Sequence, residues 1–338
     1  MKAAVFTAPG MIEYNPNYPD PTVGDGIILQ VKAGGICGTD IKALAGHRPG
    51  MNPPMILGHE FSGQVIESHM DEYKIGDRIS VAPYAGCGIC DLCLNDREEL
   101  CKNKFGTPSG CFSEKIAIPA SLAKKTAWHV PDGVGWDEAA LAEPLACVVL
   151  SLRSCHLEPG NSILVVGGGF MGLLHVVLAK AWGANKILLS EPNPTRRKVA
   201  EALGATTIDP TANPDMCKWS SDMTNGRGPN IVVTPVGIPE VVESAIDCAA
   251  QGGYVHMFGG LPKDKKISVS AYTIHYKEVS LIGTSGFRTK DYRLAADMIA
   301  NRKVVLTDLI SKRYSLENAK EAFNSAQDQN NLKIIINP

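Results

Sequence analysis

Ser162-Ile-Leu-Val-Val-Gly-Gly-Gly-Phe-Met-Gly172 joins a short apolar run to a cluster of glycines and then to a helical pattern. The run from Ile163 to Val166 has the length of a buried strand. Glycines directly after such a strand let the backbone turn tightly and approach a pyrophosphate, which binds at the start of the next helix because unpaired amides and the helix dipole favour anions there. The sequence therefore predicts a dinucleotide-binding loop with the candidate cofactor residues Gly167, Gly169, Phe170, Met171 and Gly172.

Apolar runs of strand length alternate with helical patterns from about residue 150 to residue 286. This alternation is typical of an α/β fold with a doubly wound parallel sheet. Two of the helices between the strands are expected to end at Gly183 and Gly204, since glycine takes the left-handed conformation that closes a helix. The expected strands are Ile163 to Val166, Lys186 to Ser190, Ile231 to Thr234, Tyr254 to Phe258 and Val279 to Ile282.

Glu191 ends the second of these strands, nineteen residues after Gly172. A carboxylate there can accept hydrogen bonds from both hydroxyls of an adenosine ribose, and it would repel a 2′-phosphate. We therefore expect NAD rather than NADP as the cofactor. A solvated acid at the end of a strand is the alternative interpretation. Arg196 and Arg197 follow at the start of the next helix, where they could reach the adenine or a phosphate.

The regions on either side of this segment differ from it. Residues 1–145 are rich in Gly and Pro and contain short Val/Ile runs, which predicts a β-rich domain. Residues 287–338 are too few to fold alone, so we expect them to return to that first domain, while residues 146–286 form the second. The elements expected in the tail are helices over 290–301 and 316–327 and a strand over 332–336.

Four cysteines lie close together in a Gly-rich stretch, as Cys87-Gly-Ile-Cys90-Asp-Leu-Cys93 followed by Cys101. Four thiolates at this spacing can surround one tetrahedral zinc ion and stabilise a lobe, about residues 86–102, that has no large core. A closed shell of four sulfurs leaves no open position, so the predicted zinc is structural. Buried or disulfide-bonded cysteines are the alternative, which a cytoplasmic compartment disfavours.

A second candidate metal site is dispersed over the first domain and consists of Cys37, His59 and Glu143, with Glu60 next to His59. One thiolate, one imidazole and one carboxylate make a three-ligand zinc site whose fourth position is free, as Lewis-acid catalysis requires. Adjacent residues of an extended segment point to opposite sides, so His59 and Glu60 should not both bind the metal without a turn. Each element alone is also compatible with an ordinary loop or core residue.

Charge and length exclude several classes of protein. The chain has 338 residues, with 33 basic and 35 acidic side chains and no long basic block, so a nucleic acid or an anionic membrane is not an expected partner. The first ten residues lack the order of a signal peptide, and we expect a cytoplasmic protein. The uncharged run from Pro159 to Ala179 contains three consecutive glycines and a histidine, which indicates a buried strand, turn and helix rather than a membrane span.

Taken together, these motifs resemble the zinc-containing medium-chain dehydrogenase/reductase superfamily over essentially the whole chain. Within it, the chain is similar to the polyol branch, which includes sorbitol, threonine, butanediol and sugar-alcohol-phosphate dehydrogenases. The segments that carry the resemblance are the cysteine lobe, Cys37-Gly-Thr-Asp40, Gly58-His-Glu60, Ala142-Glu-Pro-Leu145 and Ile274-His-Tyr-Lys277.

The resemblance implies a GroES-like catalytic domain, split in sequence around a Rossmann domain that binds NAD. It also implies two zinc ions per chain and a homotetramer or homodimer, to which the cysteine lobe could contribute a subunit contact. Cys37, His59 and Glu143 would bind the catalytic zinc, and Glu60 would be a carboxylate that can replace water or Glu143. The sequence does not decide between Glu60 and Glu143 as the resting ligand.

Three positions depart from the family pattern. Lys42 stands five residues after the zinc cysteine, where many threonine and sorbitol enzymes have a histidine of the proton path. Cys111 stands where a second glycine is common, and Pro235 interrupts a strand end that should approach the nicotinamide; neither has a functional interpretation from the sequence. We expect the remaining cysteines to be packing residues: Cys147, Cys155, Cys217 and Cys248.

The activity that the resemblance implies is reversible oxidation of a secondary alcohol to a ketone with NAD, on a small-molecule alcohol such as a polyol or sugar alcohol. Thr39 would relay the proton, because its hydroxyl both donates and accepts. Asp40 would orient His59 through its other ring nitrogen, or cap a helix, or both. His47, with Lys42 or Arg48, is a candidate contact to the distal end of a polyol or a sugar phosphate, the alternative being an exposed loop histidine.

Several alternatives to a polyol dehydrogenase stay open. Polyol phosphates, butanediol and L-threonine are alternative substrates. A catalytically silent cofactor-binding protein is the alternative from another class, and it would be expected to lack one of the metal ligands, whereas none of Cys37, His59 and Glu143 is missing here.

Overall fold

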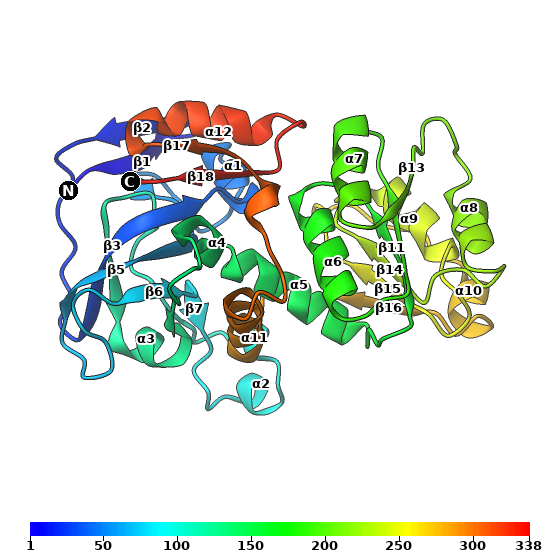
Figure 1. Cartoon of the computed structure of the whole chain (residues 1–338), viewed down its shortest axis with the longest axis horizontal. Coiled ribbons are helices and arrows are strands. Elements are labelled where there is room, and N and C mark those ends of the chain that lie inside the picture. The colour runs from blue at the N-terminus through cyan, green and yellow to red at the C-terminus, as the bar shows by residue number, and fades with distance from the viewer. The chain divides into compact units, whose positions relative to one another are not determined.

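The chain folds into two compact units, described here by a computed structural model that covers residues 1–338. The first unit comprises Met1–Cys147 and Phe287–Pro338, and the second comprises Val148–Gly286. Both termini lie in the first unit (Figure 1). The first segment of the first unit ends at Cys147, two residues after the boundary expected at 145. The chain re-enters this unit at Phe287, the residue expected from the sequence.

The first unit is built on a largely antiparallel sheet with the strand order β10-β6-β5-β3-β18-β17, in which β9 also pairs with β3. Its central strand, β3 (Gly26–Gly35), is buried along most of its length because β5, β9 and β18 all pair with it. The other strands are β5 (Glu60–Ser68), β6 (Arg78–Val81), β9 (Lys115–Pro119), β10 (Trp128–His129), β17 (Ile310–Tyr314) and β18 (Lys333–Ile336).

Two smaller sheets complete the strands of this unit. The order in the three-stranded sheet is β2-β1-β4, and the other sheet is a two-stranded antiparallel pair, β7-β8. The strands are β1 (Ala3–Ala8), β2 (Met11–Asn15), β4 (Met55–Ile56), β7 (Tyr84–Ala85) and β8 (Phe105–Gly106).

Short helices connect these strands. The longest one confined to this unit, α11 (Thr289–Ala300), lies within one residue of the helix expected at 290–301. The expected helix over 316–327 is α12 (Ala319–Gln327), preceded by a separate 3-10 turn at Leu316–Asn318. The remaining elements are α1 (Gly38–Leu44), α2 (Asp91–Leu94), α3 (Ala120–Thr126), α4 (Trp136–Ala140) and the 3-10 turns Glu98–Leu100 and Thr307–Leu309.

The tail returns to the first unit, as expected, and does so through its sheet. β18 lies between β3 and β17, antiparallel to the first and parallel to the second. The sequence pattern did not predict β17, because its burial pattern leaves three successive residues exposed and so shows no apolar alternation.

The second unit is a parallel sheet of six strands in the order β13-β12-β11-β14-β15-β16, the doubly wound arrangement expected from the alternation of elements. Helices lie on both sides of it (Figure 1). The strands are β11 (Ser162–Val166), β12 (Lys186–Ser190), β13 (Thr206–Ile208), β14 (Ile231–Thr234), β15 (Tyr254–Met257) and β16 (Ser280–Gly283), and the helices are α6 (Phe170–Ala181), α7 (Pro194–Ala202), α8 (Met216–Met223), α9 (Pro239–Asp247) and α10 (Ala271–His275). A further helix, α5 (Ala142–Ser154), begins in the first unit and ends in the second.

Local signals in the second unit agree with the sequence. Gly183 and Gly204 follow α6 and α7 with φ of 81° and 102°, the left-handed conformation predicted for both helix ends. None of the helices combines the length and the apolar character that a membrane span needs.

One expectation about the cysteines was wrong. Cys217 and Cys248 were expected to be separate packing residues, but they form a disulfide between α8 and the end of α9. Cys248 is also part of the apolar core of this unit. The pairing was not predictable because 31 residues separate the two cysteines and each lies in an ordinary helical context.

Candidate active site

The four lobe cysteines converge on one point in the first unit. The sulfurs of Cys87, Cys90, Cys93 and Cys101 all lie within 4.8 Å of one another, and none of the four forms a disulfide. Hydrogen bonds from backbone amides lower the pKa of Cys87 to about 6, which favours the thiolate that zinc binds. This donor set has the composition of a closed four-sulfur zinc site.

A second group of side chains that could hold a metal lies in the same unit and consists of Cys37, His59 and Glu60, whose ligand atoms are within 4.8 Å of one another. Cys37 follows β3 and is the N-cap of α1, while Glu60 is the first residue of β5. His59 and Glu60 reach the same point because Gly58, with φ of 95°, makes the turn that an extended segment would lack.

Cys111 packs beneath this turn. Its side chain is fully buried, and a Cβ added to Gly58 would lie 2.6 Å from the Cys111 sulfur and 3.0 Å from the ring of Phe112. The turn that presents His59 therefore needs glycine both for its φ and for space. Cys111, which had no functional interpretation from the sequence, supports the metal-binding loop as a packing residue, and burial raises the pKa of its thiol.

Asp40 connects the loops that carry these ligands. It is fully buried, and its carboxylate accepts hydrogen bonds from the backbone N–H of Cys37 at 2.9 Å and of Gly58 at 3.1 Å. Its Oδ1 also lies 3.4 Å from Nδ1 of His59. Asp40 thus occupies the capping box of α1 and at the same time faces the imidazole, which leaves Nε2 of His59 for a metal.

The electrostatics around His59 favour the imidazolium when no metal is bound. Burial by itself lowers the pKa of His59, but the Asp40 carboxylate and Cys37 outweigh it, and the pKa is raised well above its usual value. A metal cation would take the place of the proton between these negative groups.

The Glu60 carboxylate forms a buried ion pair with Lys333 of β18. Lys333 Nζ lies 2.9 Å and 2.8 Å from the two carboxylate oxygens, and it also donates to the carbonyl of Ile36 at 3.0 Å. The two side chains are 1% and 3% exposed. Gly35 has no room for a side chain here, since a Cβ would lie 2.1 Å from Oε2 of Glu60.

Glu143 is placed apart from that three-residue cluster. It lies in the first turn of α5, is buried, and is not among the side chains whose ligand atoms come within 4.8 Å of each other. Burial raises the pKa of Glu143 to about 7, against the opposing effect of His59. Of the two carboxylates left open by the sequence, the structure brings Glu60 to Cys37 and His59.

The candidate proton-relay and substrate residues lie on α1 and the loop after it. Thr39 is half-buried in the first turn of α1, two residues after Cys37. Lys42 and His47 have exposed side chains, and their backbones are joined by a hydrogen bond of 2.9 Å from His47 N–H to the carbonyl of Lys42.

The glycine loop of the second unit makes the tight turn that its sequence predicted. Gly167 has φ of 119°, and a Cβ on Gly172 would lie 1.9 Å from the carbonyl oxygen of Gly167. Gly169 is the N-cap of α6, which begins at Phe170. The first amides of α6 therefore have no intrahelical partner, as an anion site requires.

Glu191 lies beside this loop and is 4% exposed. Its carboxylate accepts hydrogen bonds from the backbone N–H of Gly168 at 2.6 Å and of Asn193 at 2.7 Å. Arg196 NH1 is 3.9 Å from Oε2 of Glu191, and the buried Nε of Arg196 has no hydrogen-bond partner. An unsatisfied donor next to a carboxylate and a glycine loop fits a polar ligand such as the adenosine end of a dinucleotide.

Arg197 takes a different role from Arg196. Its guanidinium donates to the backbone carbonyls of Glu191 and Pro192 and lies 3.1 Å from Oδ2 of Asp209. Arg197 therefore links the loop after β12 to Asp209. Further along the sheet, β14 ends at Thr234, directly before Pro235.

Two features of the sites were missed from the sequence. Lys333 stands at the start of an isoleucine run, and a lysine in a strand that is otherwise apolar was a signal of a buried charge partner. The other is a buried chain of hydrogen bonds through Ser151, His175, His256 and Thr284, for which the sequence holds no motif.

Comparisons with known proteins agree over the whole chain. Residues 24–132 match the family model of the alcohol dehydrogenase GroES-like domain, and residues 171–301 match the model of the zinc-binding dehydrogenase family. Sorbitol dehydrogenase of Bacillus subtilis is 31% identical over 100% of this chain and 97% of its own length. D-arabitol-phosphate dehydrogenase of Enterococcus avium is 31% identical over 99% of this chain and 97% of its own.

A solved structure from Sinorhizobium meliloti 1021, assigned as a zinc-binding dehydrogenase and bound to NADP, has a TM-score of 0.91 and 32% identity. The match covers 100% of this chain and 99% of that one.

Proposed function

The chain belongs to the zinc-containing medium-chain dehydrogenase/reductase superfamily, in its polyol dehydrogenase branch, and from that premise we propose that it oxidises a secondary hydroxyl of a polyol or sugar alcohol to a ketone with NAD. The observation that carries the proposal is the convergence of Cys37, His59 and Glu60 within 4.8 Å. These three donors are a thiolate, an imidazole and a carboxylate, which is a ligand set of catalytic zinc with one position left open.

Zinc held by these donors would act as a Lewis acid on the alcohol oxygen, and the nicotinamide would accept the hydride. The residues of the chain have separate tasks around this chemistry. Asp40 fixes the tautomer of His59 and holds the two ligand loops together through its bonds to Cys37 and Gly58. The Thr39 hydroxyl would pass the proton from the alcohol toward solvent.

Glu60 and Glu143 would share the carboxylate role. Glu60 is tied to Lys333, so its negative charge is already balanced in the absence of a metal. Glu143 is buried with its pKa raised to about 7, and it would ionise when a cation is bound nearby. We propose Glu60 as the resting ligand and Glu143 as the carboxylate that replaces it during the cycle.

The test of the site is substitution of its ligands. Cys37→Ser and His59→Ala should each remove one equivalent of zinc and lower kcat/KM by at least about 100-fold, because several kcal/mol of Lewis-acid stabilisation are lost. Circular dichroism and cofactor binding should be unchanged. Either variant with near-wild-type turnover would show that the site is wrong. A wild type that holds zinc and cofactor but turns over none of the alcohols tested would favour the alternative of a silent cofactor-binding protein.

The substrate is tested with a panel. Initial rates of cofactor reduction should be highest with polyols such as sorbitol, and lower with polyol phosphates, 2,3-butanediol and L-threonine. Lys42 in place of a histidine argues against the threonine reaction. A polyol phosphate is the second candidate, because Lys42 and Arg48 are exposed cations on α1 and the loop that follows. A phosphate ester that exceeds its parent polyol in kcat/KM would assign that substrate instead.

The preference for NAD rests on Glu191. Its carboxylate next to Gly168 would repel a 2′-phosphate, whereas Arg196 is the one residue there that could attract it. We expect kcat/KM to be higher with NAD than with NADP. Glu191→Gln should reduce the ratio of the two kcat/KM values, because it removes the charge of the side chain while keeping its shape. A preference of the wild type for NADP would refute this role of Glu191.

The cysteine lobe supports a proposal about assembly. Ile89 and Leu94 between its cysteines are 82% and 71% exposed, which is unusual for large apolar side chains on a free surface. We propose a homodimer or homotetramer with two zinc ions per chain, in which the lobe forms part of a subunit contact. Native mass spectrometry measures both numbers, and a monomer with one zinc would contradict the proposal.

A further inference from the structure

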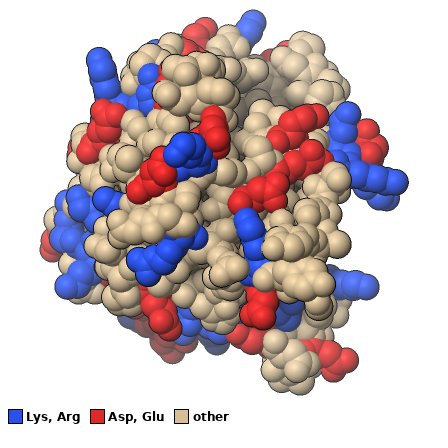
Figure 2. Space-filling view, turned by 90° about the vertical axis from the view of Figure 1, so that its right-hand side faces the viewer, with Lys and Arg blue, Asp and Glu red and all other residues tan.

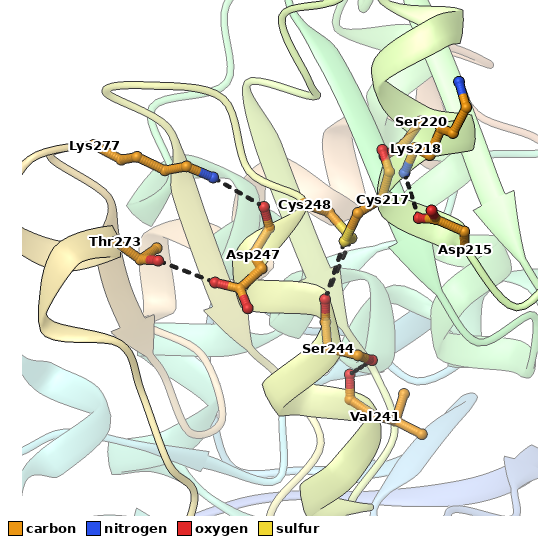
Figure 3. Close-up of a disulfide and its surroundings, with 10 residues drawn as sticks. All are labelled: Asp215, Cys217, Lys218, Ser220, Val241, Ser244, Asp247, Cys248, Thr273 and Lys277. Atoms are coloured by element: carbon orange, nitrogen blue, oxygen red, sulfur yellow. Dashed lines mark hydrogen bonds between the residues drawn. A yellow bond between two sulfur atoms is a disulfide. The ribbon is translucent and has the colours of Figure 1, made fainter.

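The Cys217–Cys248 disulfide has surroundings that suit a reversible bond. Cys217 is the second residue of α8, and Cys248 is the C-cap of α9 (Figure 3). The carbonyl oxygen of Ser244 lies 3.3 Å from each of the two sulfurs. This oxygen can accept a hydrogen bond from an S–H group, so a thiol on either cysteine has an acceptor close by once the S–S bond is broken.

The two sulfurs differ in reactivity. Cys217 is half-buried and lies in the first turn of α8, near the positive end of the helix dipole. Cys248 is 4% exposed and lies at the opposite, negative end of α9. Cys217 is therefore the thiol that a dissolved disulfide reaches first and that attacks it. Cys248 is less accessible and is placed to react with Cys217.

A cavity of about 960 Å³ opens beside the bond, and both cysteines line it. The charged side chains of its wall are four cations and one anion, namely Lys186, Lys218, Arg227, Lys277 and Asp247.

Asp247, the one anion of the wall, offsets only part of this positive charge. The Asp247 carboxylate accepts a hydrogen bond from the hydroxyl of Thr273 at 3.0 Å, and its backbone carbonyl accepts one from Lys277 at 3.2 Å. Lys218 is paired with Asp222 at 2.9 Å on the outer side of α8. The cavity keeps a surplus of positive charge after these contacts.

This surplus is a local feature. Figure 2, which looks onto the side of the second unit that carries α8 and α10, shows basic and acidic side chains interspersed over that face. A long polyanion would meet both signs there, whereas a small anion inside the cavity would meet mainly cations.

We propose that Cys217 and Cys248 form a thiol–disulfide exchange site, and that its exchange partner is an anionic low-molecular-weight disulfide or thiol of the glutathione type. In the oxidising direction, the Cys217 thiolate attacks one sulfur of the small disulfide, forms a mixed disulfide and releases one small thiolate. The Cys248 thiolate then attacks the Cys217 sulfur, forms the Cys217–Cys248 bond and releases the second. Two electrons pass from the protein to the small disulfide, and the two protons of the protein thiols go to the two small thiols.

The test compares disulfides of different charge on the reduced full chain. Oxidised glutathione (anionic), bis(2-hydroxyethyl) disulfide (neutral) and cystamine (cationic) are added at equal concentration, and the adducts on Cys217 are followed by alkylation and peptide mapping. The rate should be at least about tenfold higher with oxidised glutathione than with cystamine, and the difference should shrink at high salt. Cys248→Ser should trap the mixed disulfide on Cys217, and Cys217→Ser should abolish the reaction at Cys248.

A charge-matched pair of variants tests the cavity. Lys186→Gln with Arg227→Gln should remove most of the preference for oxidised glutathione. Lys198→Gln with Lys263→Gln removes the same charge from exposed positions of the same unit outside the cavity, and it should keep the preference. Equal rates for the three disulfides, or no bond between Cys217 and Cys248 after oxidation, would overturn the proposal. Neither result depends on dehydrogenase activity.

Discussion

The Asp40 carboxylate organises two loops that are eighteen residues apart in the chain. One oxygen accepts from the backbone N–H of Cys37, and the other accepts from the backbone N–H of Gly58 while it faces His59. A single buried side chain thus sets the distance between the thiolate and the imidazole. Metal affinity should depend on it even though it offers the metal no ligand.

We expect Asp40→Asn to weaken zinc binding at the Cys37 site by about 10–100-fold, because an amide can accept at one position only and carries no charge to hold the imidazole. Competition with a chromophoric chelator measures the affinity. Asp308→Asn, at an exposed position, is the control and should leave it unchanged. Activity lost by Asp40→Asn at full zinc occupancy would contradict a positioning role through the metal.

Lys333 is expected to matter for stability as well as for the site. Burial opposes the charged form, but Glu60 outweighs it and the pKa of Lys333 is raised. Removing one partner of a buried ion pair leaves an uncompensated charge, so Lys333→Met should destabilise the first unit by about 3–5 kcal/mol. The double variant Glu60→Gln with Lys333→Met should recover much of this loss in urea denaturation. A smaller stability for the double variant than for the single one would argue against the pair.

At this scale the short motifs identified two groups of side chains that the structure brings together, Cys87 with the other lobe cysteines and Cys37 with His59 and Glu60, while metal binding by them stays a prediction. It could not predict that Glu60 rather than Glu143 joins Cys37 and His59, since that depends on the turn at Gly58. The pairing of Glu60 with Lys333 spans 273 residues, and no local pattern carries information over such a distance.

Elements of the second unit are joined by a buried chain of side-chain hydrogen bonds. His175 of α6 bonds to the carbonyl of Met171 and to Ser151 of α5, and Ser151 bonds to His256 of β15. Because a carbonyl only accepts, Nδ1 of His175 carries the proton and its Nε2 accepts from Ser151. His256 then donates from Nδ1 to Ser151 and accepts from Thr284 through Nε2.

This chain should make the second unit sensitive to acid. Burial lowers the pKa of His175 to about 3 and that of His256 to about 4. The unfolded chain binds a proton on each ring at pH below about 6.5, while the folded chain does not until much lower pH, so stability falls as pH falls. We expect each histidine to cost about 2 kcal/mol between pH 7 and pH 5.

Urea denaturation at several pH values checks this dependence. His175→Gln should be less stable than wild type at pH 7 but should lose about half as much of its remaining stability on acidification. His69→Gln, an exposed histidine of the first unit, should follow the wild type. If the free energy of unfolding depends on pH equally in wild type and His175→Gln, the buried ring does not contribute to the acid sensitivity.

At the scale of elements, periodicity predicted five of the six strands of the parallel sheet to within one or two residues. It missed β13, which has only three residues and begins with two threonines. It also missed the disulfide between α8 and α9, because helix patterns say which face is apolar and not which side chains on two helices meet.

The whole molecule should hold two zinc ions with different exchange behaviour. The Cys37 site has an open position through which a chelator can approach, whereas four thiolates leave none. Mild chelation should therefore abolish activity while one zinc per chain is retained, and added zinc should restore it. Loss of both ions at one rate, followed by mass spectrometry, would contradict the distinction. Cys93→Ala, in the four-cysteine lobe, should lower Tm without the selective loss of activity that mild chelation causes.

The place of β18 between β3 and β17 has a consequence for how the protein is made. A ribosome delivers residues 148–286 before Lys333, so the second unit can fold during synthesis while the central sheet of the first still lacks a strand. Until that strand is synthesised, Glu60 lacks its ion pair with Lys333, and the loop at Ile36 lacks the hydrogen bond from the same lysine. Nascent chains released just before residue 333 should therefore bind the nicotinamide cofactor but fail to load zinc at the Cys37 site, and a few further residues should restore both this zinc loading and the protease resistance of the amino-terminal half.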